Sequence, residues 1–93
     1  MEQVECLYDR YIKDFRCKYY MTKSTKQYID DKDVVSVFGV KIDKLDKLGS
    51  VISTASVRDV GINERDVRQF IKKLNDGRVT PITLRDIVKD RQG

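Results

Sequence analysis

The sequence predicts a mainly α-helical protein, a small helical bundle that contains a helix-turn-helix and, in one of two interpretations, a short β-wing. Three observations lead to this fold class. Apolar residues recur every three or four positions near the N-terminus, a glycine turn separates two capped segments in the second half, and only one proline and five glycines interrupt 93 residues. A chain of this length makes one domain, 1–93, with little stability to spare.

The composition describes a folded chain with a highly charged exterior. Charged residues make up 37% of the chain, well above the roughly 25% of an average domain. The net charge of +4 permits an acidic partner without demanding one. Because no stretch approaches the ~18 apolar residues of a membrane span, we expect a cytoplasmic protein, nucleoid-associated if bacterial, with no membrane partner.

An enzyme is not expected. The sequence has no histidine, which is the commonest general base and metal ligand, and no glycine-rich phosphate loop. The acidic run Asp30, Asp31 and Asp33 lacks the loop length and the terminal glutamate of a calcium site. Cys6 and Cys17 would lie too far apart on one helix for a disulfide, so both are expected to be free thiols. We therefore predict no cofactor, no metal and no catalytic residue.

The first predicted element is an amphipathic scaffold or dimer helix over 4–20. Its apolar residues share one face and are Val4, Leu7, Tyr8, Tyr11, Ile12, Phe15 and Tyr19. Two functional alternatives are open for this tyrosine-rich segment. It could dock onto a host enzyme as an inhibitor or adaptor. It could also bind single-stranded nucleic acid, because aromatic and basic residues interleave in the set Lys18, Tyr19, Tyr20, Lys23, Lys26 and Tyr28.

A second helix is predicted to begin at Asp30 or Asp31, to run through Phe38 and to end at Gly39. Leu45 and Leu48 follow and are expected to be buried. Superposing Gly39 on Gly61 aligns the apolar positions around both glycines. The segment around Gly39 is therefore a second, weaker candidate for the helix-turn-helix that contacts DNA. The segment around Gly61 is the better candidate because its last helix is longer and carries arginine.

The stretch 53–74 predicts a helix-turn-helix. A short first helix starts at Ser53 or Thr54, Gly61 supplies a positive φ for the turn, and Ile62 tucks beneath it. Asn63 caps the second helix, 64–74. The apolar face of that helix consists of Val67, Phe70, Ile71 and Leu74, which leaves a basic face free.

That basic face suggests contact with the major groove of DNA. Arginine pairs with guanine and glutamine with adenine, and the first turns of a recognition helix reach the base edges. The predicted base contacts are Arg65, Arg68 and Gln69. The predicted phosphate contacts are Ser53, Thr54, Arg58, Lys72, Lys73 and Arg78.

Two interpretations are open for residues 75–83. In the first, the turn signal Asn75-Asp76-Gly77-Arg78 leads into two short strands that form a wing. A final helix over 84–90 then buries Leu84, Ile87 and Val88. In the second, Thr80 is the cap and Pro81 the first helical residue, which removes the wing.

The run 57–90, V-R-D-V-G-I-N-E-R-D-V-R-Q-F-I-K-K-L-N-D-G-R-V-T-P-I-T-L-R-D-I-V-K-D, resembles the winged helix-turn-helix of excisionase-like and MerR-like DNA-binding proteins. The resemblance implies a short helix, a recognition helix, a wing and a further helix. With the basic face, it leads to one expected function, a small sequence-specific DNA-binding regulator or architectural factor of phage, plasmid or mobile-element type. We expect it to place helix 64–74 in the major groove of double-stranded DNA, acting as a homodimer or as a cooperative array.

Overall fold

The structure is a computed structural model that describes residues 2–27 and 34–92. Within these residues, four strands are followed by two helices. The strands are β1 (Gln3–Ile12), β2 (Phe15–Gln27), β3 (Val34–Leu45) and β4 (Val51–Gly61), and the helices are α1 (Glu64–Asp76) and α2 (Pro81–Gln92).

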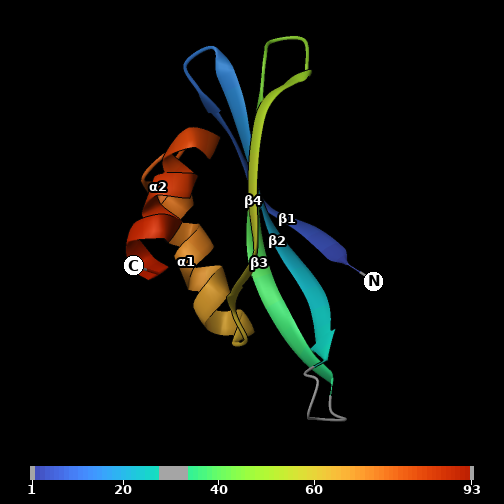
Figure 1. Ribbon diagram of the computed structural model, residues 1–93. Coiled ribbons are helices and arrows are strands. Elements are labelled where there is room, and N and C mark those ends of the chain that lie inside the picture. Colours follow the sequence, from blue (N-terminus) through green and yellow to red (C-terminus); the bar gives the residue numbers. More distant parts are fainter. Residues whose placement is uncertain (1, 28–33, 93) are drawn as a thin grey trace.

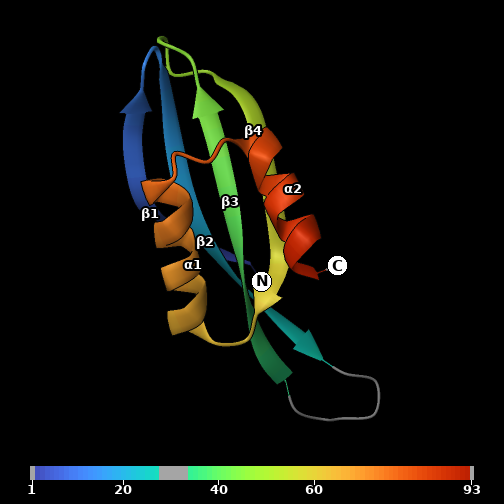
Figure 2. The ribbon, with the colours of Figure 1, turned by 90° about the vertical axis from the view of Figure 1, so that its left-hand side faces the viewer.

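The strands form one antiparallel sheet in the order β1-β2-β3-β4, so each strand pairs with its neighbour in sequence. Both helices lie against the same face of this sheet (Figure 1). They lie side by side there, α1 packed mainly on β2 and β3 and α2 mainly on β4 (Figure 2). The predicted mainly α-helical bundle is therefore wrong, because the fold is mainly β with a helical layer on one side.

The predicted helix 4–20 is a β-hairpin. β1 and β2 pair antiparallel around the turn Lys13-Asp14, where Lys13 has a φ of 56°. The register shifts between Cys6 and Tyr8, so Leu7 is an extra residue and both Leu7 and Tyr8 pack against the core. In a regular strand, every second residue points to the same face of the sheet. The bulge and the two-residue turn each interrupt this alternation, so the apolar residues of the hairpin recur at spacings that resemble those on one face of a helix.

The segment predicted as a helix and a weaker helix-turn-helix is β3 from Val34 onward; residues 30–33 lie outside the described residues. Leu45 is buried as predicted, but Leu48 is 92% exposed in the turn between β3 and β4. The positive φ in this region belongs to Gly49, at 87°. Valine, isoleucine and phenylalanine dominate β3 and suit a pleated surface better than a helix.

β4 occupies the place of the first helix of the predicted helix-turn-helix, which is therefore wrong. Gly61 does not have a positive φ, and Ile62 is 67% exposed instead of tucked under a turn. The position that requires glycine is instead Gly39 in β3, where there is no room for a side chain. A Cβ there would lie 2.1 Å from the backbone oxygen of Val57, because the β3–β4 register shifts next to Gly39 and brings the two backbones together.

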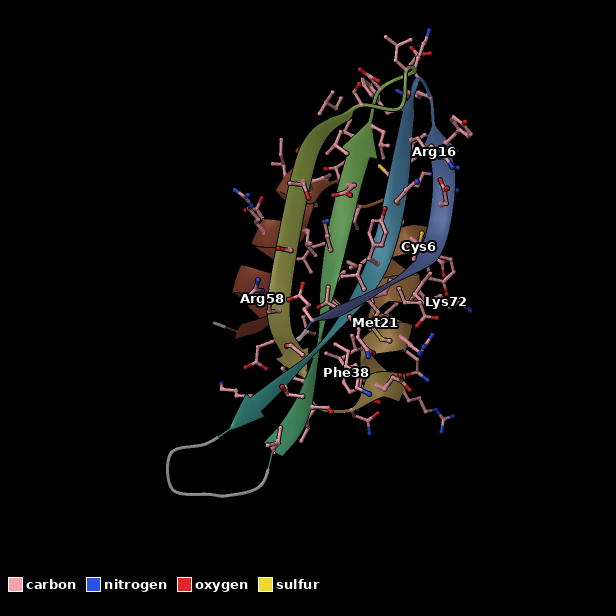
Figure 3. All side chains as sticks on the ribbon, turned by 90° about the vertical axis from the view of Figure 1, so that its right-hand side faces the viewer. Cys6, Arg16, Met21, Phe38, Arg58 and Lys72 are labelled. Atoms are coloured by element: carbon pink, nitrogen blue, oxygen red, sulfur yellow. The ribbon has the colours of Figure 1, made fainter. Side chains whose placement is uncertain are left out.

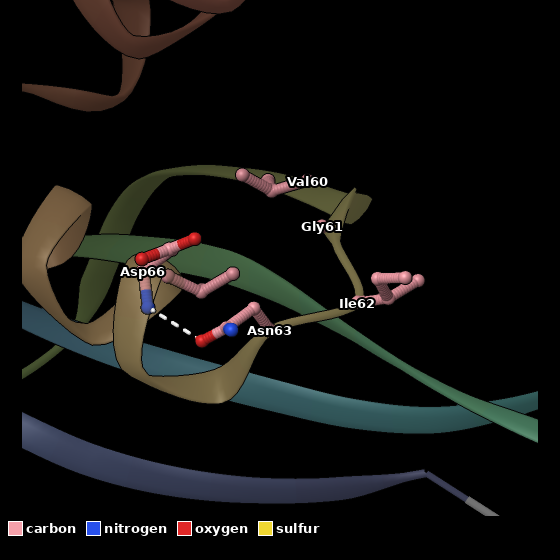
Figure 4. Close-up of a pocket in the computed structure, with 6 residues that line it drawn as sticks. Val60, Gly61, Ile62, Asn63 and Asp66 are labelled. Carbon is pink, nitrogen blue, oxygen red and sulfur yellow. Dashed lines mark hydrogen bonds between the residues drawn. The ribbon is translucent and has the colours of Figure 1, made fainter.

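The helix α1 is confirmed at its predicted start and on its predicted buried face. The side chain of Asn63 accepts a hydrogen bond from the backbone N–H of Asp66 at 3.2 Å (Figure 4). Its buried residues are Val67, Phe70, Ile71 and Leu74. They pack onto core residues of the sheet, which include Tyr19 and Ile42.

The wing predicted for 78–83 is wrong, and the alternative with Pro81 at the start of a helix is confirmed. The backbone N–H of Leu84 donates to the carbonyl of Thr80 at 2.9 Å, and Pro81 opens α2. Leu84 is fully buried and Ile87 packs against the core. The side chain of Val88 lies outside the described ones.

Candidate functional site: the open face of the sheet

The face of the sheet opposite the helices forms the candidate site. Figure 3 looks onto this face, where no helix lies over the strands. The N-terminal end of β1 crosses in front of β2 and β3 in that view, and Glu2 Oε2 lies 3.1 Å from Arg58 Nε on β4. The uncovered part of the face therefore extends from this crossing toward the two hairpin turns. We call this part the open face.

Strand alternation decides which side chains the open face carries. Along β2, Cys17, Tyr19 and Met21 point to the helices and are buried in the core. The residues between them point the other way. On that side β2 carries Arg16, Lys18 and Tyr20. Their partners in the strand register are Cys6, Asp9 and Tyr11 on β1 and Lys41, Asp43 and Leu45 on β3, and Thr54 and Ser56 of β4 pair in turn with Asp43 and Lys41.

Tyr11 and Arg16 lie opposite each other at the hairpin end of the open face. The Tyr11 side chain is 74% exposed, and the Arg16 guanidinium lies 5.7 Å from its ring centroid. Arg16 also holds the carboxylate of Asp9 with two hydrogen bonds, one of them from Nε at 2.6 Å. This hydrogen bonding lowers the pKa of Asp9, which keeps the pair ionised. The open face therefore presents the Tyr11 ring and the Arg16 guanidinium, which Asp9 holds in place, next to each other.

Tyr20 lies near the middle of the open face, with the Lys41 ammonium 5.6 Å from its ring centroid. Lys41 Nζ also lies 3.8 Å from Asp43 Oδ2, and the Thr54 hydroxyl donates to Asp43 Oδ1 at 2.6 Å. Burial raises the pKa of Tyr20, and the carboxylate of Asp43 raises it further. The ring therefore stays a neutral phenol at physiological pH.

Lys18 lies between these two groups on the same face and is paired with Asp43 in the strand register. Within the described part of the chain its ammonium makes no ion pair. Arg16 and Tyr20 are separated by four residues, or about 13 Å along a strand. The open face thus presents a linear track of Arg16, Lys18 and Tyr20, with Tyr11 and Lys41 beside it.

The site residues predicted from the sequence are divided between two layers. Ser53, Thr54 and Arg58 lie on the sheet strand β4. Thr54 is engaged with Asp43, and Arg58 with Glu2. None of the three caps a helix. The prediction that Ser53 or Thr54 contacts a phosphate as a helix-capping group therefore has no structural basis.

The other predicted contacts lie in the helical layer. Arg65, Arg68, Gln69, Lys72 and Lys73 are on α1, and Arg78 follows it with a φ of 54°. Figure 3 shows Lys72 beyond the β1 edge and Arg58 at the β4 edge, so the predicted set does not converge. Arg68 is neutralised by Glu5 at 2.9 Å and Glu64 at 3.7 Å. The α1 residues share a helix, but they do not form one uncompensated basic surface.

The predicted tyrosine-lysine strip is also divided by the sheet. Lys18 and Tyr20 lie on the open face, whereas Tyr19 is buried beneath the helices. Lys23 and Lys26 lie farther along β2, near the Phe38 ring and Asp59 respectively. Tyr28 lies outside the described residues. The missed signal was the alternation along β2, which would have separated Tyr19 from Tyr20 and added Arg16.

Among the described residues, the hollows beside β1, at the start of α1 and along α1 are open to solvent. The hollow at the start of α1 has a volume of about 170 Å³, and its polar groups Asn63 and Asp66 form the helix cap (Figure 4). A usual ligand pocket measures about 300–1,000 Å³. A larger hollow of about 390 Å³ on α1 is open and lined by Asp66, Gln69, Phe70 and Lys73.

Three further features bear on the kind of site. Among the described residues, no group of cysteine, aspartate and glutamate side chains is arranged to hold a metal ion. Neither helix of the described chain is long and apolar enough to cross a membrane. Both cysteines are free thiols, Cys6 exposed and Cys17 buried.

The chain belongs to the family of unknown function DUF6514, whose model matches residues 1–93. No curated protein matches the chain, and no solved structure does. The family match gives no link to excisionase-like or MerR-like proteins, and two elements that this resemblance implied, the first short helix and the wing, are not found in the described structure.

Proposed function

We propose that the protein binds single-stranded nucleic acid on the open face of its sheet. One observation carries this proposal: Tyr11 and Tyr20 lie on an uncovered face in line with Arg16, Lys18 and Lys41, and each ring lies within 6 Å of a cation. Single strands are held by aromatic rings that stack on bases and by basic side chains that contact phosphates. A four-stranded sheet backed by helices is a common platform for such stacking.

The charges of the open face support this ligand. Its carboxylates, Asp9 and Asp43, are already engaged by Arg16, Lys41 and Thr54. Lys18 is the cation with the greatest freedom to contact a phosphate, and it lies between the two aromatic rings. The Arg16–Tyr20 separation of about 13 Å corresponds to a few nucleotides of a single strand.

Duplex DNA fits the same face less well, because its bases are stacked on one another and cannot stack on a tyrosine. Duplex recognition through α1 stays a prediction that no observation tests. The homodimer was predicted because one small module reads few base pairs of a duplex, and a single-stranded ligand does not require a dimer. Free thiols favour a cytosolic setting, which we include in this proposal.

The test is fluorescence anisotropy with a labelled oligouridine, an oligothymidine and a duplex of equal length. We expect the single strands to bind more tightly than the duplex. Tyr20→Leu keeps apolar bulk but removes the stacking surface, and it should weaken single-strand binding about five- to 150-fold. Lys18→Ala should reduce the salt dependence of log Kd by about 0.7 per log unit of salt.

Lys72→Ala provides the matched control, since it removes an exposed lysine from α1 on the other layer. It should leave single-strand binding unchanged. Preference for the duplex, or a loss caused by Lys72→Ala and not by Lys18→Ala, would move the site to α1 and overturn the proposal. Circular dichroism of each variant verifies that the sheet is intact.

A further inference from the structure

Two hairpin turns lie together at one end of the molecule, which measures 49 Å along its longest axis. They are the β1–β2 turn at Lys13-Asp14 and the β3–β4 turn at 46–50, and both extend past the helices (Figures 1 and 2). Lys47 Nζ of one turn lies 3.6 Å from Asp14 Oδ1 of the other. We call residues 11–16 and 44–52 the hairpin end.

Exposed apolar side chains are concentrated at this hairpin end. Of the nine large apolar side chains that are exposed in the described part of the chain, five belong to it. They are Tyr11 at 74%, Phe15 at 37%, Leu48 at 92%, Val51 at 54% and Ile52 at 50%. Single exposed apolar residues are ordinary on a protein surface, but a cluster at a projecting end marks an interaction site.

The β3–β4 turn holds Leu48 outward in a fixed position. Asp46 Oδ1 accepts hydrogen bonds from the backbone N–H groups of Leu48 and Ser50, each at 2.9 Å. The backbone N–H of Gly49 donates to the Asp46 carbonyl at 3.1 Å, and that of Asp46 donates to the Ser50 carbonyl at 2.9 Å. Because the turn is held by its own hydrogen bonds, the exposure of Leu48 is built into the hairpin.

Lysines surround this apolar end. Lys13 and Lys47 are exposed, and the Lys44 ammonium lies 4.1 Å from the Phe15 ring centroid. The two carboxylates of the turns are engaged, Asp14 with Lys47 and Asp46 with backbone N–H groups. The hairpin end is therefore convex, apolar at its tip and basic around it.

We infer that the hairpin end binds the surface of an anionic phospholipid membrane. Leu48 and Ile52 enter the boundary between headgroups and acyl chains, while the lysine ammoniums remain at the anionic headgroups. The cytoplasmic leaflet carries the negative charge that these lysines complement. The sequence predicted no membrane partner because it has no spanning segment; surface binding needs none. This inference is tested separately from nucleic-acid binding, since Leu48, Ile52, Lys13 and Lys47 lie outside the track on the open face; Tyr11 and Arg16 belong to both surfaces.

The experiment is cosedimentation of the full chain with vesicles of phosphatidylcholine alone and of phosphatidylcholine mixed with phosphatidylserine. We expect binding to the phosphatidylserine vesicles and its loss at high salt. Leu48→Ser should weaken the partition about tenfold, and it should not affect folding because the side chain is 92% exposed. Lys47→Gln and Lys13→Asn should each weaken it about fivefold; asparagine tolerates the positive φ of position 13.

Ile62→Ser is the matched control, since Ile62 is 67% exposed in the connection between β4 and α1, which lies at the other end of the helical layer from the hairpin turns (Figure 2). It should partition like the unaltered protein. Equal partition of Leu48→Ser and Ile62→Ser, or no binding to phosphatidylserine vesicles, would overturn the inference; the latter result leaves the hairpin end as a protein-docking surface. Leu48→Ser should also keep its single-strand affinity, so failure of one proposal is distinguishable from failure of the other.

Discussion

The hydroxyl of Tyr19 donates a hydrogen bond to the backbone carbonyl of Val79 across 2.9 Å. Tyr19 lies in β2 with 0% of its surface exposed, and Val79 lies in the connection between α1 and α2. The backbone N–H of Val79 donates to the carbonyl of Leu74 at 3.0 Å. The connection is therefore held both to the sheet and to α1, which fixes the helical layer to one face and leaves the other face open.

Tyr19→Phe should lower the free energy of unfolding by about 1–2 kcal/mol, because it removes the hydroxyl donor and leaves the Val79 carbonyl without this hydrogen bond. Urea denaturation followed by circular dichroism measures the change. Tyr11→Phe is the control: Tyr11 is 74% exposed, and its change should stay within about 0.5 kcal/mol. Equal effects of the two substitutions would show that the Tyr19 hydrogen bond does not stabilise the fold.

Stability should fall at alkaline pH. Burial raises the pKa of Tyr19 to about 12 from an ordinary value of 10.0. The unfolded chain therefore releases this proton first, so the contribution of Tyr19 is fully present below pH 10 and declines as the pH rises toward 12. Burial also raises the pKa of the Cys17 thiol above 9.0, which acts in the same direction. The slope from each group is at most about 1.4 kcal/mol per pH unit.

The measurement is the urea midpoint as a function of pH, for the unaltered protein and for Tyr19→Phe. The variant should lose less stability than the unaltered protein between neutral pH and about pH 11, because it lacks one of the linked protons. An equally steep decline in both proteins would assign the alkaline transition to other groups.

Gly39→Ala should destabilise the protein by about 3 kcal/mol or more, since its Cβ would lie 2.1 Å from the Val57 backbone oxygen and only a backbone shift could relieve the clash. Gly61→Ala supplies the control. Its Cβ would meet only the Val67 side chain, at an ordinary 3.5 Å. Thermal unfolding should show a large loss for the first variant and a small change for the second. Comparable melting temperatures would mean that β4 can move away from Gly39.

Asn63→Ala should cost about 0.5–2 kcal/mol, because it removes the side-chain acceptor for the Asp66 N–H at the start of α1. Asn63→Asp retains an acceptor and should remain close to the unaltered stability. Chemical denaturation of the two variants checks this pair. A loss of similar size in Asn63→Asp would show that the amide nitrogen, and not the cap, is the stabilising group.

The tyrosine-rich N-terminal half shows why the fold class was predicted wrongly. Leu7, Tyr8, Ile12, Phe15 and Tyr19 have the spacing of a helix face, but that spacing results from a bulge and a turn inserted into strand alternation. The uninterrupted alternation Phe15-Cys17-Tyr19-Met21 was the available sign of a strand. Tyrosine and β-branched residues agree with it.

The candidate site was predicted in part. The interleaving of Lys18 and Tyr20 indicated a stacking strip. Tyr11 and Lys41 could not be included, because they reach the same face only through pairing with Arg16 and Tyr20 on β2. The basic face of α1 was also visible in the sequence, but the carboxylate of Glu5, which neutralises Arg68, comes from a distant strand.

The sequence by itself determined α1, and it gave the start of α2 at Pro81 as one of two alternatives. The Asn63 cap, the apolar face of α1 and the compatibility of Pro81 with a first helical turn are all set by residues within a few positions of one another. Only the tertiary structure decided how the strands pair into a sheet, that Tyr19 is buried in the core and that Tyr20 lies on the uncovered face. The physical reason is that a helix satisfies its backbone hydrogen bonds within its own segment, whereas a strand depends on a partner elsewhere in the chain. That partner also decides which side chains meet the core.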